Sequence, residues 1–307
     1  MSHDHAHLSK IAAAAVLWGT TGVAVTLLSR ITALSPITIG FYRLAIAAVA
    51  LLAYTRIRTL IRPTPSRAGS LFLTAPGRLV LTGVFLGLYQ ALYFISVANA
   101  GVGVATMVSL GIAPIGLLIW ESIRARRRPS RRALTVATAA VAGLALISAG
   151  PSGVAPRPWL GLVAAIGSGL GYAISAVLSR SLADRADPLT LTAATSAIGA
   201  LALLPIAAAA GLTFTPGATA ITLLLYLGVT TTAVAYALFY AGLRGVAGSA
   251  ATVLTLLEPV TAALLAAAVL GETLAPAALV GGGLVLAAVV MLAIRPAARR
   301  PTVVQVS

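Results

Sequence analysis

Apolar stretches long enough to cross a bilayer, each nearly free of charge, follow one another along the chain. They cover residues 9–29, 36–56, 77–98, 103–123, 133–150, 158–180, 188–210, 218–241, 246–270 and 276–295. A membrane-spanning helix needs about 20 predominantly apolar residues. Only 9% of the residues are charged, whereas a soluble domain carries about 25%. The sequence therefore predicts an all-α integral membrane protein with ten transmembrane helices in the lipid bilayer.

The positive charges orient this predicted bundle. With the N-terminus in the cytoplasm, all but three of the 21 Lys and Arg residues fall on the inner side. The exceptions are Arg30 and Arg157 on the outer side and Arg43 within the second apolar stretch. Cytoplasmic loops of membrane proteins carry an excess of Lys and Arg. We therefore expect a multi-pass protein of the cell (inner) membrane with both tails, residues 1–8 and 296–307, in the cytoplasm.

The same composition limits the partners and cofactors. The net charge of +15 comes from short arginine clusters between apolar stretches, such as RARRRPSRR (124–132). In a membrane protein such clusters set the topology, so we expect no nucleic-acid partner. Cysteine is absent, and the three histidines all lie in MSHDHAH (1–7). We interpret this segment as a disordered polar tail. Metal binding by its histidines is the alternative, because imidazole is a common metal ligand. No cofactor and no other metal site are expected.

The two halves of the chain resemble each other weakly. GVATMVSLGIAP (103–114) aligns with GSAATVLTLLEP (248–259), and shorter matches occur in the same order. This predicts two five-helix repeats, residues 9–150 and 156–295. Because five is odd, the second copy enters the membrane from the opposite face. Inverted repeats of this kind are typical of transporters, whose substrate site lies near the midplane between the halves.

A carboxylate and a proline stand side by side inside the apolar stretch 246–270. Glu258 is expected near the midplane, where facing lipid would cost about 2.5–3.5 kcal/mol, so it should face the bundle interior. Pro259 leaves the carbonyl of Thr255 without its helical donor. Pro114 occupies the equivalent place in the first half. We interpret Pro114 and Pro259 as paired kinks or hinges around a central site, with simple packing kinks as the alternative.

Here the sequence resembles a known family. Glu258-Pro259, the Ala/Leu-rich run after it and Leu270-Gly271-Glu272 resemble the closing segment of the EamA-type drug/metabolite transporter superfamily. AVLWGTTGVA (15–24), SPITIGFYRLAIAA (35–48) and AYALFYAGLRGV (235–246) are similar to its first, second and eighth helices. The resemblance implies a ten-helix inner-membrane carrier that often exports amino acids or other small metabolites. It also implies a central cavity between helices 1–4 and 6–9, with helices 5 and 10 at the periphery.

The first half departs from the family pattern. Its closing Gly-Glu is missing, because Arg127 stands thirteen residues after Pro114. Glu121 is the nearby acid, and we expect it to pair with Arg124 rather than to take over the role of the absent glutamate.

The apolar stretches also contain a few large polar and aromatic side chains. The predicted transport-pathway residues are Glu258, Trp18, Arg43, Gln90, Tyr93, Tyr172 and Tyr236. Arg43 could instead extend to the membrane surface, and tyrosines also form belts at membrane interfaces. We assign Tyr89 and Tyr240 to such belts.

These features predict a secondary transporter for a small-molecule substrate. It would export small organic metabolites, amino acids or amphipathic drug-like solutes, by alternating access. Any ion coupling would use protons through Glu258. The sequence has no phosphate-binding loop and no catalytic constellation, so we expect no enzyme activity. The alternative is a non-transporting membrane assembly or signalling protein. Glycines at 143 and 281–283 suit close packing of peripheral helices. The same helices are a candidate contact for a homodimer.

Overall fold

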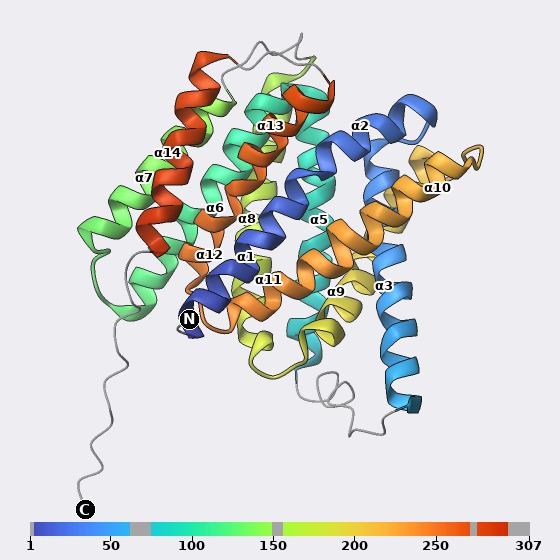
Figure 1. Ribbon diagram of the computed structural model, residues 1–307, viewed down its shortest axis with the longest axis horizontal. Coiled ribbons are helices and arrows are strands. Elements are labelled where there is room, and N and C mark those ends of the chain that lie inside the picture. The colour runs from blue at the N-terminus through green and yellow to red at the C-terminus, as the bar shows by residue number, and fades with distance from the viewer. Residues whose placement is uncertain (1–2, 62–74, 149–155, 271–274, 294–307) are drawn as a thin grey trace, which may run out of the picture.

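The computed structural model describes residues 3–61, 75–148, 156–270 and 275–293, and these residues fold as a bundle of helices (Figure 1). In chain order the helices are α1 (His3–Gly19), α2 (Thr21–Ile31), α3 (Pro36–Ile61), α5 (Pro76–Ala100), α6 (Val102–Ala125), α7 (Arg131–Ile147), α8 (Pro158–Ala183), α9 (Pro188–Ala210), α10 (Ala218–Leu225), the π-helix η1 (Tyr226–Val234), α11 (Ala235–Leu243), α12 (Gly248–Thr255), α13 (Leu257–Leu270) and α14 (Pro276–Ala293). Within the described ranges there is no strand, so the all-α prediction is confirmed.

Eight helical stretches are long and apolar enough to cross a membrane. They are His5–Ile31, Pro36–Arg58, Pro76–Ala100, Val104–Ala125, Pro158–Ala183, Pro188–Ala210, Ala218–Leu243 and Gly248–Val269. The two remaining predicted spans are shorter, since α7 has 17 residues and the apolar part of α14 covers Pro276–Met291. The protein is a multi-pass membrane protein. Membrane crossing by α7 and α14 stays a prediction.

The first helix begins earlier than the sequence suggested. It starts at His3, and His7 Nδ1 donates a 3.0 Å hydrogen bond to the carbonyl of Ala241 in α11. The expectation of a disordered tail is therefore wrong for residues 3–8. The imidazole of His7 holds this segment against α11.

Three of the predicted spans are interrupted. The first breaks at Thr20 between α1 and α2, and the ninth breaks at Leu256 between α12 and α13. The break at Leu256 leaves Pro259 in the first turn of α13, where its missing N–H costs no helical bond. Pro114, by contrast, lies inside the uninterrupted α6.

The third interruption is a stretch of π-helix in the middle of the eighth predicted span. In η1 the hydroxyls of Thr231 and Thr232 both donate to the carbonyl of Leu227, at 2.8 and 2.7 Å. Threonine hydroxyls compete in this way with the backbone donors of a helix. Widened turns of this kind often occur at functional sites.

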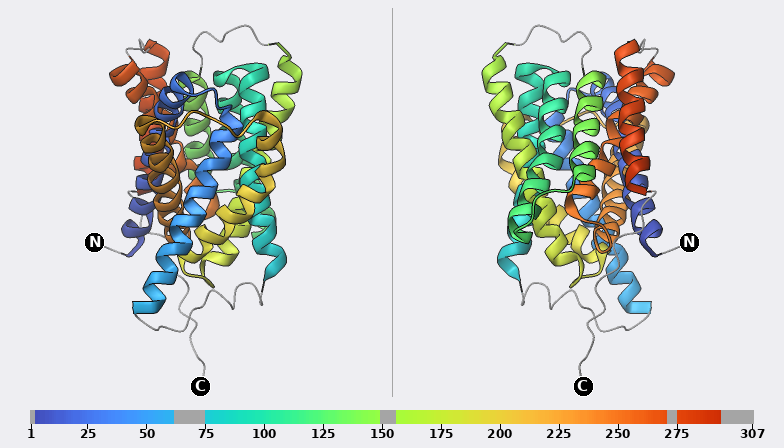
Figure 2. Two further views of the ribbon diagram at one scale, coloured as in Figure 1. Left: turned by 90° about the vertical axis from the view of Figure 1, so that its right-hand side faces the viewer. Right: turned by 90° about the vertical axis from the view of Figure 1, so that its left-hand side faces the viewer.

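Tight helix crossings hold the bundle together. α5 packs on α8 and α9, α3 on α9 and η1, α1 on α11, α12 and α13, and α6 on α8 and α12. α7 and α14 pack mainly on each other at one edge of the bundle, on the left in Figure 1 and in front in the right-hand view of Figure 2. Gly143 and Gly281 bring their backbones together, as the glycine pattern predicted, because any Cβ there would meet the facing chain.

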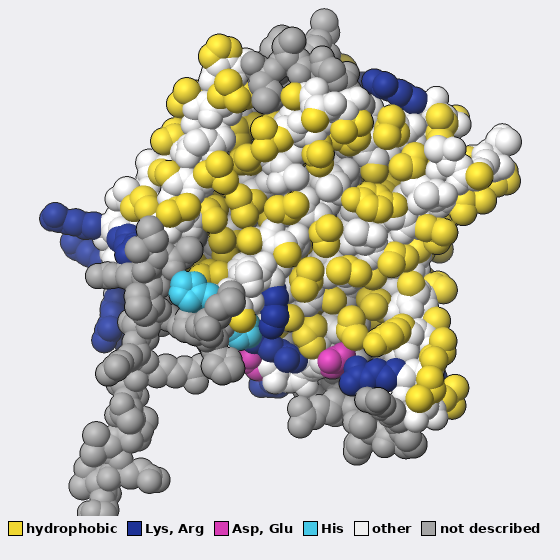
Figure 3. All heavy atoms as spheres, in the orientation of Figure 1, with side chains coloured by type: hydrophobic (Ala, Val, Ile, Leu, Met, Phe, Trp, Pro, Cys, Tyr) yellow, Lys and Arg dark blue, Asp and Glu magenta, His cyan; other side chains and the backbone are white. Residues whose placement is uncertain are grey.

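The surface fits a protein surrounded by lipid. Hydrophobic side chains cover most of the face seen in Figure 3, and Lys and Arg side chains gather mainly near its lower end and left edge. Large apolar side chains such as Val49, Leu201 and Val163 are 69%, 67% and 59% exposed. In water such a surface would aggregate, whereas lipid solvates it.

Candidate functional site

Six aromatic side chains from α1, α5, α8 and α11 meet inside the bundle, and we call them the central aromatic cluster. They are Trp18, Tyr89, Tyr172, Tyr236, Phe239 and Tyr240. The ring of Trp18 lies 4.9 Å from that of Tyr236 and 5.3 Å from that of Phe239. Tyr89 and Tyr172 pack edge to face at 5.3 Å. Tilted and edge-to-face pairs of this kind each contribute about 0.5–1.5 kcal/mol beyond the area they bury.

The phenol groups of this cluster are hydrogen-bonded within the protein. The hydroxyls of Tyr89 and Tyr236 share a hydrogen bond of 2.5 Å, which joins α5 to α11. Tyr172 donates to Thr255 Oγ1 at 3.4 Å, at the end of α12. Thr255 is the last residue of α12, so the break in the ninth span lies beside the cluster.

Arg43 brings a cation into the interior from α3. Its side chain is only 8% exposed, and its Nε donates to Thr232 Oγ1 of η1 at 3.3 Å. An arginine extending to the membrane surface would be exposed, so that alternative does not fit. Among the described residues this is the hydrogen bond that the Arg43 side chain makes.

Glu258 brings the opposite charge. It lies in the first turn of α13, where the positive end of the helix dipole favours a carboxylate. It stands near the middle of the span Gly248–Val269. The break at Leu256 therefore places the acid at a helix start inside the bundle.

A glycine allows the two broken spans to touch. Gly19, the last residue of α1, faces Thr261 and the carbonyl of Glu258, and an added Cβ would lie 2.5 and 2.7 Å from them. The neighbouring Thr20 hydroxyl shares a 2.7 Å hydrogen bond with the Tyr226 hydroxyl at the start of η1. The interruptions of the first, eighth and ninth spans thus lie together around the site.

The seven predicted pathway residues are not all in one place. The structure brings together Trp18, Arg43, Tyr172, Tyr236 and Glu258. Gln90 is buried, but its amide donates to Leu86 on its own helix at 3.1 Å. Tyr93 shares a 2.9 Å hydrogen bond with the hydroxyl of Thr106 in α6, and its ring packs against Phe94 rather than against the central aromatic cluster.

Sequence reasoning missed several residues of the site, among them Tyr89, Tyr240, Phe239 and Thr232. Tyr89 and Tyr240 were assigned to interfacial belts, but Tyr240 is 1% exposed and Tyr89 joins two other tyrosines. The mid-helix position of Tyr89, thirteen residues after the start of α5, could have indicated this. Thr232 gave no comparable signal, because only the fold brings it to Arg43.

Glu121 also has a partner that the sequence did not suggest. Its carboxylate accepts from the backbone N–H and the hydroxyl of Ser249, at 3.1 and 2.5 Å. Ser249 lies in the first turn of α12, so Glu121 caps that helix rather than pairing with Arg124. This contact joins α6 of the first half to α12 of the second half.

Together, the apolar helices, the interrupted spans and the interior cation and anion define a membrane transporter. The comparisons agree: residues 8–149 and 159–294 match the EamA-like transporter family, so the chain belongs to that family. The two matches fall close to the predicted repeats. Family membership points to a transporter rather than to an enzyme.

Individual relatives support the same class. The chain is 31% identical over 285 residues to the uncharacterized transporter YwfM of Bacillus subtilis (strain 168), covering 92% of each chain. It is 23% identical to the uncharacterized inner membrane transporter YicL of Salmonella typhimurium, over 92% of this chain and 93% of the relative. A solved crystal structure at 19% identity has the same fold, with a TM-score of 0.74 over 93% of this chain and 96% of the other.

Proposed function

We propose that this protein is a secondary transporter of the inner membrane that exports small organic metabolites, amino acids or amphipathic drug-like solutes, by alternating access. One observation carries the proposal: the contacts of the site cross between the two halves of the chain. Trp18, Arg43 and Tyr89 belong to the first half, and each contacts Tyr236 or Thr232 of the second half. A site assembled from both halves changes when the halves move relative to each other.

The packing pattern supports an inverted repeat. Exchanging each helix with its counterpart in the other half turns one observed contact into another. The contact of α5 with α8 corresponds to that of α11 with α1, and the contact of α5 with α9 corresponds to that of η1 with α3. α3 and α9, α6 and α12, and α7 and α14 are counterparts that pack on each other. Such two-fold pairing is expected where two equivalent halves rock about a central site.

The chemistry of the site favours solutes that carry both charges. Arg43 suits a carboxylate, which a guanidinium binds through two parallel hydrogen bonds. Glu258 suits an ammonium group. Within the described structure the buried indole N–H of Trp18 has no hydrogen-bond partner, so it offers a further donor. The aromatic rings around these groups suit an apolar side chain. A solute with a carboxylate, an ammonium group and an apolar side chain is an amphipathic amino acid.

Movement in this proposal requires the central aromatic cluster to open. Its rings are in contact, so a solute passes only when the Tyr89–Tyr236 bond and the Trp18–Tyr236 packing separate. The break at Leu256, next to Pro259, supplies a place where the ninth span can bend without losing further backbone hydrogen bonds. Pro114 in α6 would be its counterpart.

Two parts of the proposal extend beyond the central contacts. Proton coupling would use Glu258, the acidic side chain in the first turn of α13. A homodimer through the peripheral α7 and α14 remains a prediction. The competing function, a non-transporting assembly or signalling protein, does not require a buried arginine and an acidic side chain inside the bundle, and so the site favours transport.

The test is flux through purified protein in proteoliposomes. Radiolabelled amino acids and amphipathic drugs are loaded into the proteoliposomes one at a time, and flux is measured with and without a pH gradient across the membrane. Saturable movement of one class, lowered by Trp18→Ala, supports the transporter and names its substrate class. Thermal unfolding checks that the protein is folded. If folded protein moves none of these solutes, the proposed substrates are wrong and the non-transporting alternative is favoured.

A further inference from the structure

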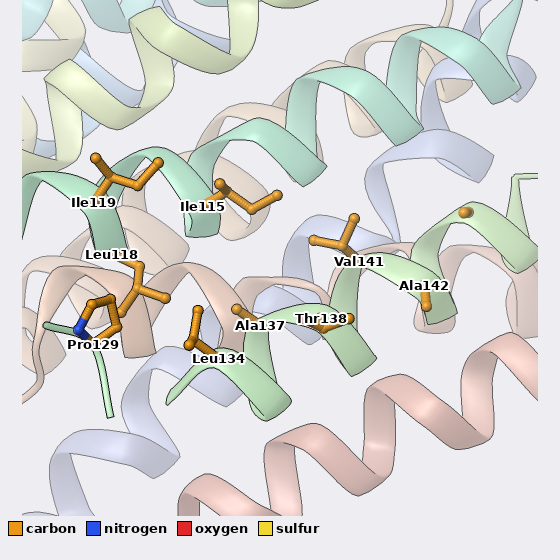
Figure 4. Close-up of a pocket in the computed structure, with 10 residues that line it drawn as sticks. Ile115, Leu118, Ile119, Pro129, Leu134, Ala137, Thr138, Val141 and Ala142 are labelled. Carbon is orange, nitrogen blue, oxygen red and sulfur yellow. The ribbon is translucent and has the colours of Figure 1, made fainter. Parts of the chain in front are cut away.

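An apolar groove of about 450 Å³ runs along the outside of the bundle between α6 and α7, away from the central site (Figure 4). Ile115, Leu118 and Ile119 line it from α6, and Leu134, Thr138 and Val141 line it from α7. Ile119 and Leu134 are 52% and 48% exposed. In a membrane such a groove takes up apolar chains from its surroundings.

One end of this groove meets the densest group of positive charge in the sequence. Pro129 and Leu134 line that end, and Arg128 and Arg131 stand beside them in the chain. These two arginines are exposed, as are Arg124, Arg126 and Arg127. Figure 3 shows Lys and Arg side chains grouped at the left edge, where Figure 1 places the turn from α6 to α7. The acid closest in sequence, Glu121, binds Ser249, and within the described residues it forms no ion pair with these arginines.

The counterpart groove of the second half provides a comparison within the same molecule. A groove of about 270 Å³ lies between α13 and α14, lined by residues such as Leu264, Ala278 and Leu286. The sequence from Leu257 to Ala293 has no Lys or Arg. The two grooves thus share position and apolar character, but among the residues that the structure describes arginines follow the lining residues of the groove between α6 and α7 and not those of its counterpart.

We propose that the groove between α6 and α7 binds an anionic phospholipid. One acyl chain lies in the groove, and the phosphate of the headgroup is held by Arg128 and Arg131. Burial of the chain supplies apolar contact, and arginine binds phosphate oxygens through paired donors. A second copy of the chain is a poorer occupant. A symmetric contact through this face would bring the same arginines of both copies together.

The test titrates purified protein in detergent with phosphatidylglycerol or with phosphatidylcholine of the same acyl chains. The thermal unfolding midpoint is followed, and native mass spectrometry counts retained lipids. We expect phosphatidylglycerol to raise the midpoint at lower concentration than phosphatidylcholine and one molecule to be retained. Each arginine near an anionic lipid contributes a factor of about five in affinity. Arg128→Gln/Arg131→Gln should therefore raise the half-maximal lipid concentration at least five-fold.

Two matched controls separate a site from general attraction. Arg56→Gln/Arg58→Gln removes the same charge from exposed positions of α3 and should leave the half-maximal concentration unchanged. Ala142→Phe fills the groove from an exposed position and leaves every arginine in place, and it should weaken phosphatidylglycerol binding. Ala278→Phe, in the counterpart groove, should leave that binding unchanged. Equal losses in both arginine variants, or unaltered binding to Ala142→Phe, would overturn the proposal. Neither readout depends on the transported solute.

Discussion

At the scale of single residues, Glu258 is the side chain on which the proposed coupling depends. Glu258→Gln keeps the shape of the side chain and removes its ability to carry a proton. If protons are coupled through this carboxyl, the variant should transport without responding to a pH gradient. Flux in proteoliposomes with and without the gradient measures this. A variant that keeps the wild-type response to the gradient excludes Glu258 as the coupling group.

Tyr236 permits a finer dissection, because its ring and its hydroxyl make different contacts. Tyr236→Phe keeps the packing on Trp18 and removes the bond to Tyr89, so it should cost about 1 kcal/mol of unfolding free energy. Tyr236→Ala removes both and should lower flux at least ten-fold, or about 1.4 kcal/mol.

The control for Tyr236 is Tyr54→Phe, because Tyr54 is 53% exposed and lies outside the cluster. Its unfolding midpoint and flux should match those of the unmodified protein. A Tyr236→Ala variant with unchanged flux would remove Tyr236 from the pathway.

At the scale of helices, Gly19 decides how closely α1 and α13 approach. Gly19→Ala places a methyl group against Thr261 and the Glu258 carbonyl, and such overpacking costs about 1–3 kcal/mol. We expect a lower unfolding midpoint and a loss of flux. Gly22→Ala is the matched control on α2, because its added Cβ meets nothing within 4 Å. Equal effects of both variants would show that the crossing does not matter.

The helices themselves could be predicted from the sequence, but their interruptions could not. Apolar length alone located α9 to the residue and the first residues of α3 and α8, which end five and three residues later than predicted. The π-helical turn of η1 arises because two threonine hydroxyls compete for the carbonyl of Leu227, and a pattern of apolar residues does not record such competition. The bond from Glu121 to Ser249 was missed for another reason. Arg124 is three residues away in sequence, whereas Ser249 becomes a neighbour only after α6 and α12 pack.

At the scale of the whole molecule, the distribution of positive charge predicts the orientation in the membrane. Because the chain contains no cysteine, single cysteines can be introduced into the unmodified background. Ala125→Cys, at the arginine-rich end of α6, should react with a membrane-impermeant maleimide only after the cells are opened. Thr215→Cys, between α9 and α10, should react in intact cells. The reverse pattern would invert the predicted topology.

The whole-molecule comparison also shows what limits inference about the site. Burial of Arg43 could be expected from the cost of a charge in lipid. Its alignment with Trp18 and Tyr236 depends on contacts between halves more than 200 residues apart, such as that of Thr20 with Tyr226. The sequence thus predicted which side chains are unusual, and the fold determined which of them meet.

The three tryptophans lie in two different environments, which makes their fluorescence useful as a probe of the bundle interior. Trp120 and Trp159 are 48% and 69% exposed on the outer surface, whereas Trp18 is 6% exposed within the central aromatic cluster. Brominated lipids quench the fluorescence of indoles that they touch, so in such bilayers the remaining emission comes mainly from Trp18. Changes at the centre of the bundle can then be followed in real time, without an added dye and without altering a single residue.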